Sequence, residues 1–338
     1  MSSAVLASHN APSGQAGVAD ADWDIALQRM GGHFLQSTLW QRVQRALGHE
    51  VIWARDEEWM WGGAIRAGRF PRYVYVPHGP TAMSSDAMVG AIAGAVDAAR
   101  ARSLDFVRAE PAGAAALPAL AATHPTPSRS IQPRWTWVLD LTPDEAALRG
   151  GLSAGHRGAI NAAPRRGLTF RVSSDPADIE IFLRLQEKGA AAGRFHGQEQ
   201  SYHRAVARTL LPEHAAALYF AEAEGEAVAA ALCFDFSGTR YYAHAVSDPD
   251  TGRRLQAAAP LVWQMILDAR ESGAHRFDFW GIAPPREAAA GAAPHAWDGF
   301  TQFKRSFGGE AVERAGTWDF GVRSLRHRLY RTALRLRR

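Results

Sequence analysis

The chain is nearly free of cysteine, and this limits the chemistry available to it. Its single cysteine, Cys233, lies in the apolar run ALCFDF and is expected to be a buried core residue. One cysteine excludes a disulfide within the chain, and no cysteine–histidine group has zinc-site spacing, so no metal is expected. This pattern fits a protein of the reducing cytoplasm.

Long apolar runs are also missing from the sequence. No run approaches the roughly 18 residues that a membrane-spanning helix requires, so no span is predicted. Residues 1–20 lack the basic start and the apolar core of a signal peptide, and we expect them to form a disordered tail.

Lysine is scarce as well. Only two lysines, Lys188 and Lys304, occur among the 38 Lys and Arg residues. Where arginine is the default, a lysine indicates a position that needs a compact point charge rather than a planar fork. The alternative is that Lys304 is an ordinary cation on a solvated helix face. The formal charge is only +4, but the arginine-rich composition gives a pI of about 9.5, which favours phosphate-bearing partners.

The length and the composition indicate two domains. A chain of 338 residues exceeds one typical domain and suits two of about 150 residues each. Its hydrophobic fraction of 47% and charged fraction of 21% are typical of soluble globular proteins.

The most informative stretch lies near the C-terminal end. Arg276–Ile282 (RFDFWGI) alternates large apolar residues with an aspartate, which predicts a strand. A Pro- and Gly-rich loop follows, and Gly299–Phe307 predicts a short helix stopped by two glycines. We expect Phe300 and Phe307 to anchor this helix while Lys304 projects from it. A strand that leads through a loop into such a helix is a good place to hold an anionic or acyl group.

This stretch, FDFWGI…GF…FKRSFGG, resembles the signature of the Fem family (FemABX-like). These enzymes are aminoacyl-tRNA-dependent peptidyltransferases that build peptidoglycan interpeptide bridges. The resemblance implies an α/β fold with two tandem GNAT-like acyltransferase domains, here without the long helical-hairpin insertion of some members. It implies transfer of glycine, alanine or serine from aminoacyl-tRNA to the stem-peptide amine of a lipid-linked or UDP-linked precursor, without a cofactor.

The resemblance also implies roles for particular residues. Lys304 is expected to supply positive charge near the acyl centre, and Glu110 is the candidate for proton removal. Matching segments imply substrate-binding roles for Gln36, His78, Arg108, Arg157, Arg194, Tyr202, Tyr242 and Trp280. His78 departs from the family, which has a basic residue there. For Glu110, an ion pair with Arg108 or another arginine is the structural alternative.

The two halves of the chain share one order of predicted elements, as expected for a fold used twice. We assign residues 21–144 plus 311–322 to the first domain and residues 145–310 to the second. The stretch 145–167 predicts a basic helix that carries Arg157, and a solvated basic face is its alternative role.

Residues 323–338 predict a basic amphipathic helix with leucines on one face. This helix suggests peripheral contact with the inner membrane surface or with RNA, or else docking through its leucines. Two other functions remain open for the whole chain. One is a GNAT-type N-acyltransferase using acyl-CoA, although the nearest pyrophosphate-loop string, 253–258, lacks the glycines. The other is a non-catalytic protein that binds RNA or a membrane surface.

Overall fold

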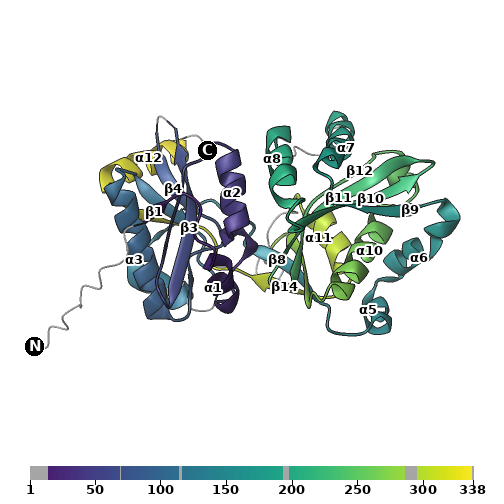
Figure 1. Cartoon of the computed structure of the whole chain (residues 1–338), viewed down its shortest axis with the longest axis horizontal. Coiled ribbons are helices and arrows are strands. Elements are labelled where there is room, and N and C mark those ends of the chain that lie inside the picture. The colour runs from purple at the N-terminus through teal and green to yellow at the C-terminus, as the bar shows by residue number, and fades with distance from the viewer. Residues whose placement is uncertain (1–13, 69, 114–115, 193–197, 286–294, 337–338) are drawn as a thin grey trace, which may run out of the picture. The chain divides into compact units, whose positions relative to one another are not determined.

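The computed structural model describes residues 14–68, 70–113, 116–192, 198–285 and 295–336. It divides into two compact units. Unit 1 consists of Met1–Gln132 and Ala315–Arg338, and unit 2 consists of Pro133–Arg314. Each unit has a mixed sheet with helices on both faces (Figure 1).

The sheet of unit 1 has the strand order β1-β2-β3-β4-β6-β15-β7, and β5 pairs with β3. Its strands are β1 (Gln15–Ala16), β2 (Val51–Arg55), β3 (Trp59–Ala67), β4 (Arg72–Val76), β5 (Thr81–Ala82), β6 (Phe106–Ala109), β7 (Thr126–Pro127) and β15 (Trp318–Gly321). The helices are α1 (Trp23–Arg29), the 3-10 turn η1 (Phe34–Gln36), α2 (Thr38–Ala46), α3 (Ser85–Ala101), α4 (Ala116–Thr123) and α12 (Ser324–Leu336).

Serine caps begin two helices of unit 1, as their sequence suggests. The Ser84 hydroxyl accepts a hydrogen bond from the Ala87 amide at α3, and the Ser37 hydroxyl accepts one from the Trp40 amide at α2. The alanine-rich face of α3 lets the helix approach the sheet closely, where it packs on residues such as Trp61. Helices α1 and α2 cover the opposite face (Figure 1).

The sheet of unit 2 has the strand order β14-β8-β13-β12-β11-β10-β9. Its strands are β8 (Trp135–Asp140), β9 (Thr169–Ser173), β10 (Ala216–Ala223), β11 (Glu226–Phe236), β12 (Thr239–Ser247), β13 (Arg276–Gly281) and β14 (Glu310–Glu313). The helices are α5 (Glu145–Gly151), α6 (Ala154–Ala162), η2 (Pro164–Arg166), η3 (Pro176–Asp178), α7 (Ile179–Ala191), α8 (Gln200–Leu210), α9 (Thr251–Arg254), α10 (Ala258–Glu271) and α11 (Asp298–Arg305).

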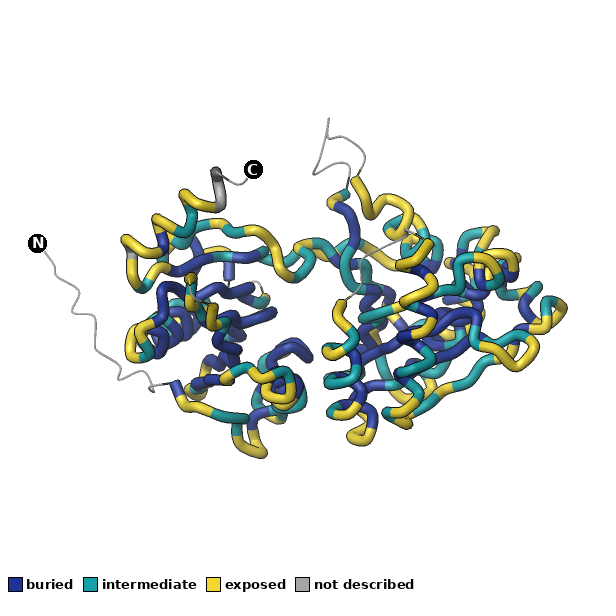
Figure 2. Tube along the Cα trace, turned by 90° about the horizontal axis from the view of Figure 1, so that it is seen from above, coloured by how far each residue is buried: buried dark blue, intermediate teal, exposed yellow. Residues whose placement is uncertain are grey.

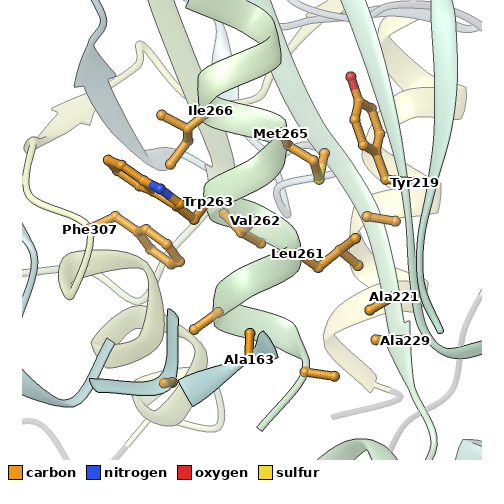
Figure 3. Packing of buried hydrophobic residues seen from close by; sticks show 14 of the residues in the cluster. Ala163, Tyr219, Ala221, Ala229, Leu261, Val262, Trp263, Met265, Ile266 and Phe307 are labelled. Atoms are coloured by element: carbon orange, nitrogen blue, oxygen red, sulfur yellow. The ribbon is translucent and has the colours of Figure 1, made fainter. Parts of the chain in front are cut away.

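Helix α10 forms the centre of the core of unit 2. It buries Leu261, Val262 and Met265 together with small side chains of β10 and β11, and Trp263 lies beside Phe307 (Figure 3). Helices α7 and α8 cover the other face of the sheet (Figure 1). Cys233 is fully buried in this core, as its apolar context predicts.

The two units repeat one topology. Each sheet has one parallel pair, β4 with β6 in unit 1 and β12 with β13 in unit 2. The remaining pairings between described strands are antiparallel. In each unit a long helix, α3 or α10, makes the connection between the parallel strands.

The domain boundaries differ from the expected ones. The strand Trp135–Asp140 belongs to unit 2, because β8 pairs with both β13 and β14. Residues 311–322, which we assigned to the first domain, divide between the units: β14 completes the second sheet, and β15 pairs with β6 in the first. The basic stretch 145–167 is likewise broken into α5, α6 and η2.

The N-terminal segment is partly ordered. We expected residues 1–20 to form a disordered tail, but Gln15–Ala16 form β1 and pair with Ile52 and Trp53 of β2. Residues 1–13 lie outside the described part. Among the described helices, none combines the length and the apolar character needed to cross a bilayer.

Candidate active site

The parallel strands β12 and β13 separate part-way along unit 2. Their ladder joins Thr239 to Arg276 and ends where Tyr241 pairs with Asp278. Strand β12 then continues to Ser247 along β11, while β13 turns toward β8. Beyond Tyr241 the facing edges of these two strands do not pair with one another, so their backbone groups can bind an extended ligand. We call this place the divergence point of β12 and β13.

A bulge in β13 shapes the divergence point. The register with β8 shifts between Asp278 and Gly281, and Trp280 adopts a left-handed backbone with φ of 64°. The amide of Trp280 donates to the Asp278 carboxylate at 2.7 Å, which fixes this unusual conformation. A side chain at Gly281 would lie 2.4 Å from the Pro133 ring, so the glycine after Trp280 is required by close packing.

The Asp278 carboxylate organises the residues around this bulge. It is almost completely buried and also accepts hydrogen bonds from the Thr136 hydroxyl and, at 3.0 Å, from Arg314. Three donors from β13, β8 and the segment after β14 therefore meet on one side chain. The sequence pointed to Asp278 only as the one charged residue between large apolar ones.

Lys304 lies in the last turn of α11 and faces this bulge. Its ammonium donates to the Gly281 carbonyl at 2.5 Å. Burial lowers the pKa of Lys304 to about 8, an effect that the nearby Asp278 carboxylate opposes. Among the residues that the structure describes, no carboxylate lies within ion-pair distance of its Nζ. The position is half-buried, so the alternative of a solvated surface cation is wrong for Lys304.

The second lysine, Lys188, is exposed and ion-paired. The ammonium of Lys188 forms an exposed ion pair with Asp248 at 3.3 Å.

Of the two aromatic residues expected to anchor α11, only one does so. Phe307 is buried and packs on Phe279, whereas Phe300 is 60% exposed, because the inward face of α11 is set by Phe303 and Phe307.

The two tyrosines expected to bind substrate lie on opposite faces of the sheet. Tyr242 packs on Phe279 on the α10 side. On the α8 side the Tyr202 hydroxyl lies 3.2 Å from Nε2 of His244. In a regular strand, residues 242 and 244 would lie on the same face of the sheet. A bulge in β12 places them on opposite faces, because Tyr242 pairs with Cys233 while His244 pairs with the adjacent residue of β11, Leu232.

Sequence reasoning missed the histidines beside Tyr202. His203 and His244 lie with their rings 4.9 Å apart. Burial lowers the pKa of His203 to about 4 and that of His244 to about 3, so both rings are neutral at physiological pH. The motif YYAHA contained His244, but no spacing rule links it to a helix 40 residues earlier.

Arg157 lies half-exposed on α6. The preceding residue, His156, packs its ring on Phe303 and Phe307, so α6 contacts the helix that carries Lys304. Among the described residues, the Arg157 guanidinium has no hydrogen-bond or ion-pair partner. Arg194 lies outside the described residues.

Glu110 lies at the end of β6 in unit 1 and is 4% exposed. Oε2 accepts from the Tyr75 hydroxyl at 2.8 Å and from the His78 amide at 3.4 Å. Oε1 accepts from the Gln132 amide at 2.9 Å and from the Thr317 hydroxyl at 2.8 Å. These four donors occupy the carboxylate's acceptor directions. The expected alternative, an ion pair with arginine, is wrong.

Arg108 and Gln36, both expected to bind substrate, make their hydrogen bonds within unit 1. Arg108 forms a buried two-point ion pair with Asp319 at 2.7 and 2.9 Å. Gln36 is fully buried and bonds to the backbone of Gly62 and Pro77 at 2.6 to 3.0 Å. His78 is also buried, with its ring 4.1 Å from that of His33.

Comparison with known proteins agrees with this fold. Residues 153–305 match the family model of the acetyltransferase (GNAT) domain. No match in sequence was found among curated proteins. Among solved structures, the chain is similar to FemX, with a TM-score of 0.79 and 16% identity, over 93% of this chain and 99% of that one.

Two further solved structures are similar over almost their whole length. One is the C-terminal domain of a putative lysylphosphatidylglycerol synthetase from Agrobacterium fabrum, with TM-score 0.62, 15% identity and coverage of 94% of this chain and 97% of that one. The other is L-PGS from Bacillus licheniformis, with TM-score 0.60, 15% identity and coverage of 95% and 98%. These likenesses confirm the predicted fold class, a mixed α/β protein with GNAT-like domains.

Proposed function

We propose that the chain is an aminoacyltransferase. It would take an amino acid from its tRNA ester and join it to the stem-peptide amine of a peptidoglycan precursor, in the cytoplasm, where charged tRNA is found. The observation that carries this proposal is the Lys304 ammonium, half-buried at the divergence point without a carboxylate partner among the described residues. The similarity to FemX and the FK..FGG motif support the choice of substrates.

The chemistry requires little beyond positioning and charge. The amine nitrogen attacks the ester carbonyl, the new C–N bond forms, and the C–O bond to the tRNA ribose breaks. The nitrogen loses a proton, and the departing ribose oxygen gains one. In between, the carbonyl oxygen carries negative charge, which a nearby ammonium stabilises. With a pKa of about 8, roughly 90% of Lys304 is protonated at pH 7.

Glu110 is a poor candidate for the proton acceptor, because four protein donors already occupy its carboxylate. We infer that it holds the end of β4 to the segment that leads into β15. We keep three of the expected substrate-binding residues in the proposal. Trp280 and Tyr242 lie at the divergence point, where they can contact substrate, and Arg157 supplies a cation for a phosphate group.

The alternative of an acyl-CoA enzyme needs free backbone amides after β12 to hold a pyrophosphate. The amides of Asp250 and Thr251 instead donate to the Asp248 carboxylate at 3.1 and 2.9 Å. The amides from Arg254 to Ala257 donate to backbone carbonyls of the same segment. Pro260 removes a further donor at the start of α10. This geometry favours the tRNA ester over acyl-CoA.

The test is a product assay with competing donors. The protein is incubated with a UDP-linked precursor and either a mixture of charged tRNAs or acetyl-CoA, and product masses are read by mass spectrometry. We expect a mass increase of one amino-acid residue from charged tRNA, and calorimetry should detect no binding of acetyl-CoA. Acetylation of the precursor, or a micromolar dissociation constant for acetyl-CoA, would overturn the proposal.

A further inference from the structure

Helix α12 docks on unit 1 through a polar and aromatic face. Arg326 forms an ion pair with the buried Asp105 at 2.6 Å. The ring of His327 lies 4.9 Å from that of Phe106, and Tyr330 stacks on the same ring at 5.5 Å. Residues 326, 327 and 330 therefore define the inward side of the helix.

Leu325 and Leu329 of α12 face away from the protein. Leu325 is 70% exposed and Leu329 is 57% exposed, and their separation of four residues places them on one side of the helix. Figure 2 shows this segment near the C-terminus as largely exposed. Phe70, itself 42% exposed, lies against Tyr330 and under Arg326, on the inward side of the helix. The docking through leucines that the sequence allowed is therefore wrong for Leu325 and Leu329.

Positive charge is concentrated on the same segment. Residues 323–338 contain seven arginines and no Asp or Glu. The whole chain has a formal charge of +4, which leaves −3 for residues 1–322. Arg328 is exposed on α12 itself and Arg323 is exposed just before it, so cations accompany the outward leucines.

We propose that the outward face of α12 binds an anionic lipid surface. Leu325 and Leu329 enter the boundary between head groups and acyl chains, and the arginines contact lipid phosphates. An RNA backbone would use the arginines but leave the leucines exposed to water, so the exposed leucines favour lipid. The proposal rests on α12 alone and does not depend on the proposed reaction.

The test measures sedimentation of the full chain with vesicles. One set contains phosphatidylcholine only, and the other also contains phosphatidylglycerol. We expect binding only to the anionic vesicles, weaker at high salt. The double variant Leu325→Ser/Leu329→Ser should bind at least tenfold more weakly, and Arg328→Gln should bind less at low salt.

Leu117→Ser is the matched control, because Leu117 is 65% exposed on α4 of the same unit. It should bind as the wild type does, and thermal melts should show every variant folded. Equal binding to neutral and anionic vesicles would overturn the proposal. Unchanged vesicle binding by the double leucine variant would also overturn it, as would salt-dependent binding of tRNA with no vesicle binding at all.

Discussion

Replacing Lys304 with methionine removes the ammonium at the divergence point and keeps most of the side-chain volume. A fall in pKa from 10.5 to about 8 corresponds to a cost of at most about 3 kcal/mol for keeping the charge there, and partial exposure reduces it. Methionine removes that cost but loses the hydrogen bond to Gly281, worth about 1 kcal/mol. The melting temperature at pH 7 should therefore stay the same or rise by a few degrees.

Activity should respond in the opposite direction. Loss of one group that stabilises an oxyanion typically costs about 2.7–4 kcal/mol, a factor of roughly a hundred to a thousand in rate. We expect Lys304→Met to reduce amino-acid transfer at least tenfold. Lys304→Arg should restore only part of it, because the planar fork is wider than an ammonium.

The pH dependence gives an independent signature of Lys304. If the ammonium is the active form, transfer should decline as pH rises through about 8. The free energy of unfolding should instead increase with pH. The folded state loses the Lys304 proton near pH 8, whereas the unfolded chain keeps it to about 10.5, so the unfolded state binds more protons in this window. The wild type should therefore gain stability relative to Lys304→Met as pH rises from about 8 to about 10.5.

The measurements are direct because the chain has only two lysines. Labelling with ¹³C-lysine gives two side-chain signals, which Lys188→Arg assigns, and a titration then reads the pKa of Lys304. Transfer is measured in a single turnover with charged tRNA and excess precursor, with Lys188→Met as the matched control. Wild-type transfer by Lys304→Met would refute the reasoning, and the site would have to be rebuilt around the arginines.

Four further substitutions test the roles inferred from hydrogen bonding. Glu110→Gln keeps the side-chain shape but cannot accept from all four donors, so it should lower the free energy of unfolding in urea by about 1–3 kcal/mol. Transfer per folded molecule should stay within about threefold, and complete loss of transfer in a folded variant would restore Glu110 as the base. Arg108→Ala leaves the buried Asp319 without its two-point partner and with only His327 beside it, so it should cost about 3–5 kcal/mol of stability. Arg157→Ala, at a half-exposed position, should leave stability unchanged and raise KM for the precursor; the reverse pattern would contradict both assignments. Asp278→Asn, which disturbs the acceptor of Thr136, Trp280 and Arg314, should cost about 1–3 kcal/mol, and a calorimetric melt identical to that of the wild type would count against it.

Local patterns predicted most of the fold. The alternation in Arg276–Ile282 located β13, and the stretch before the paired glycines located α11, which ends two residues earlier than predicted. These features depend on neighbours along the chain, which a sequence displays directly. The repeat of the topology was visible as a repeated order of elements.

The site was predicted less completely, because its contacts join distant residues. Arg108 and Asp319 are 211 positions apart, so nothing near Arg108 indicates that its guanidinium is already paired. Gln36 is satisfied by Gly62 and Pro77 in the same way. Tyr242 and Tyr202 lie on opposite faces of the sheet because of a register shift in β12, which residue types do not reveal. Lys304 was found because its rarity is a property of the sequence itself.

The return of the chain to unit 1 determines when that unit can be finished during translation. Strand β15 pairs with β6 and supplies Asp319 to Arg108, and Thr317, just before this strand, donates to Glu110. These residues leave the ribosome only after unit 2 has been synthesised. Until then a nascent chain has an open edge on β6 and a guanidinium without its carboxylate. Unit 2 contains all of its own strands and can fold first, so the order of folding should run against the usual order of synthesis.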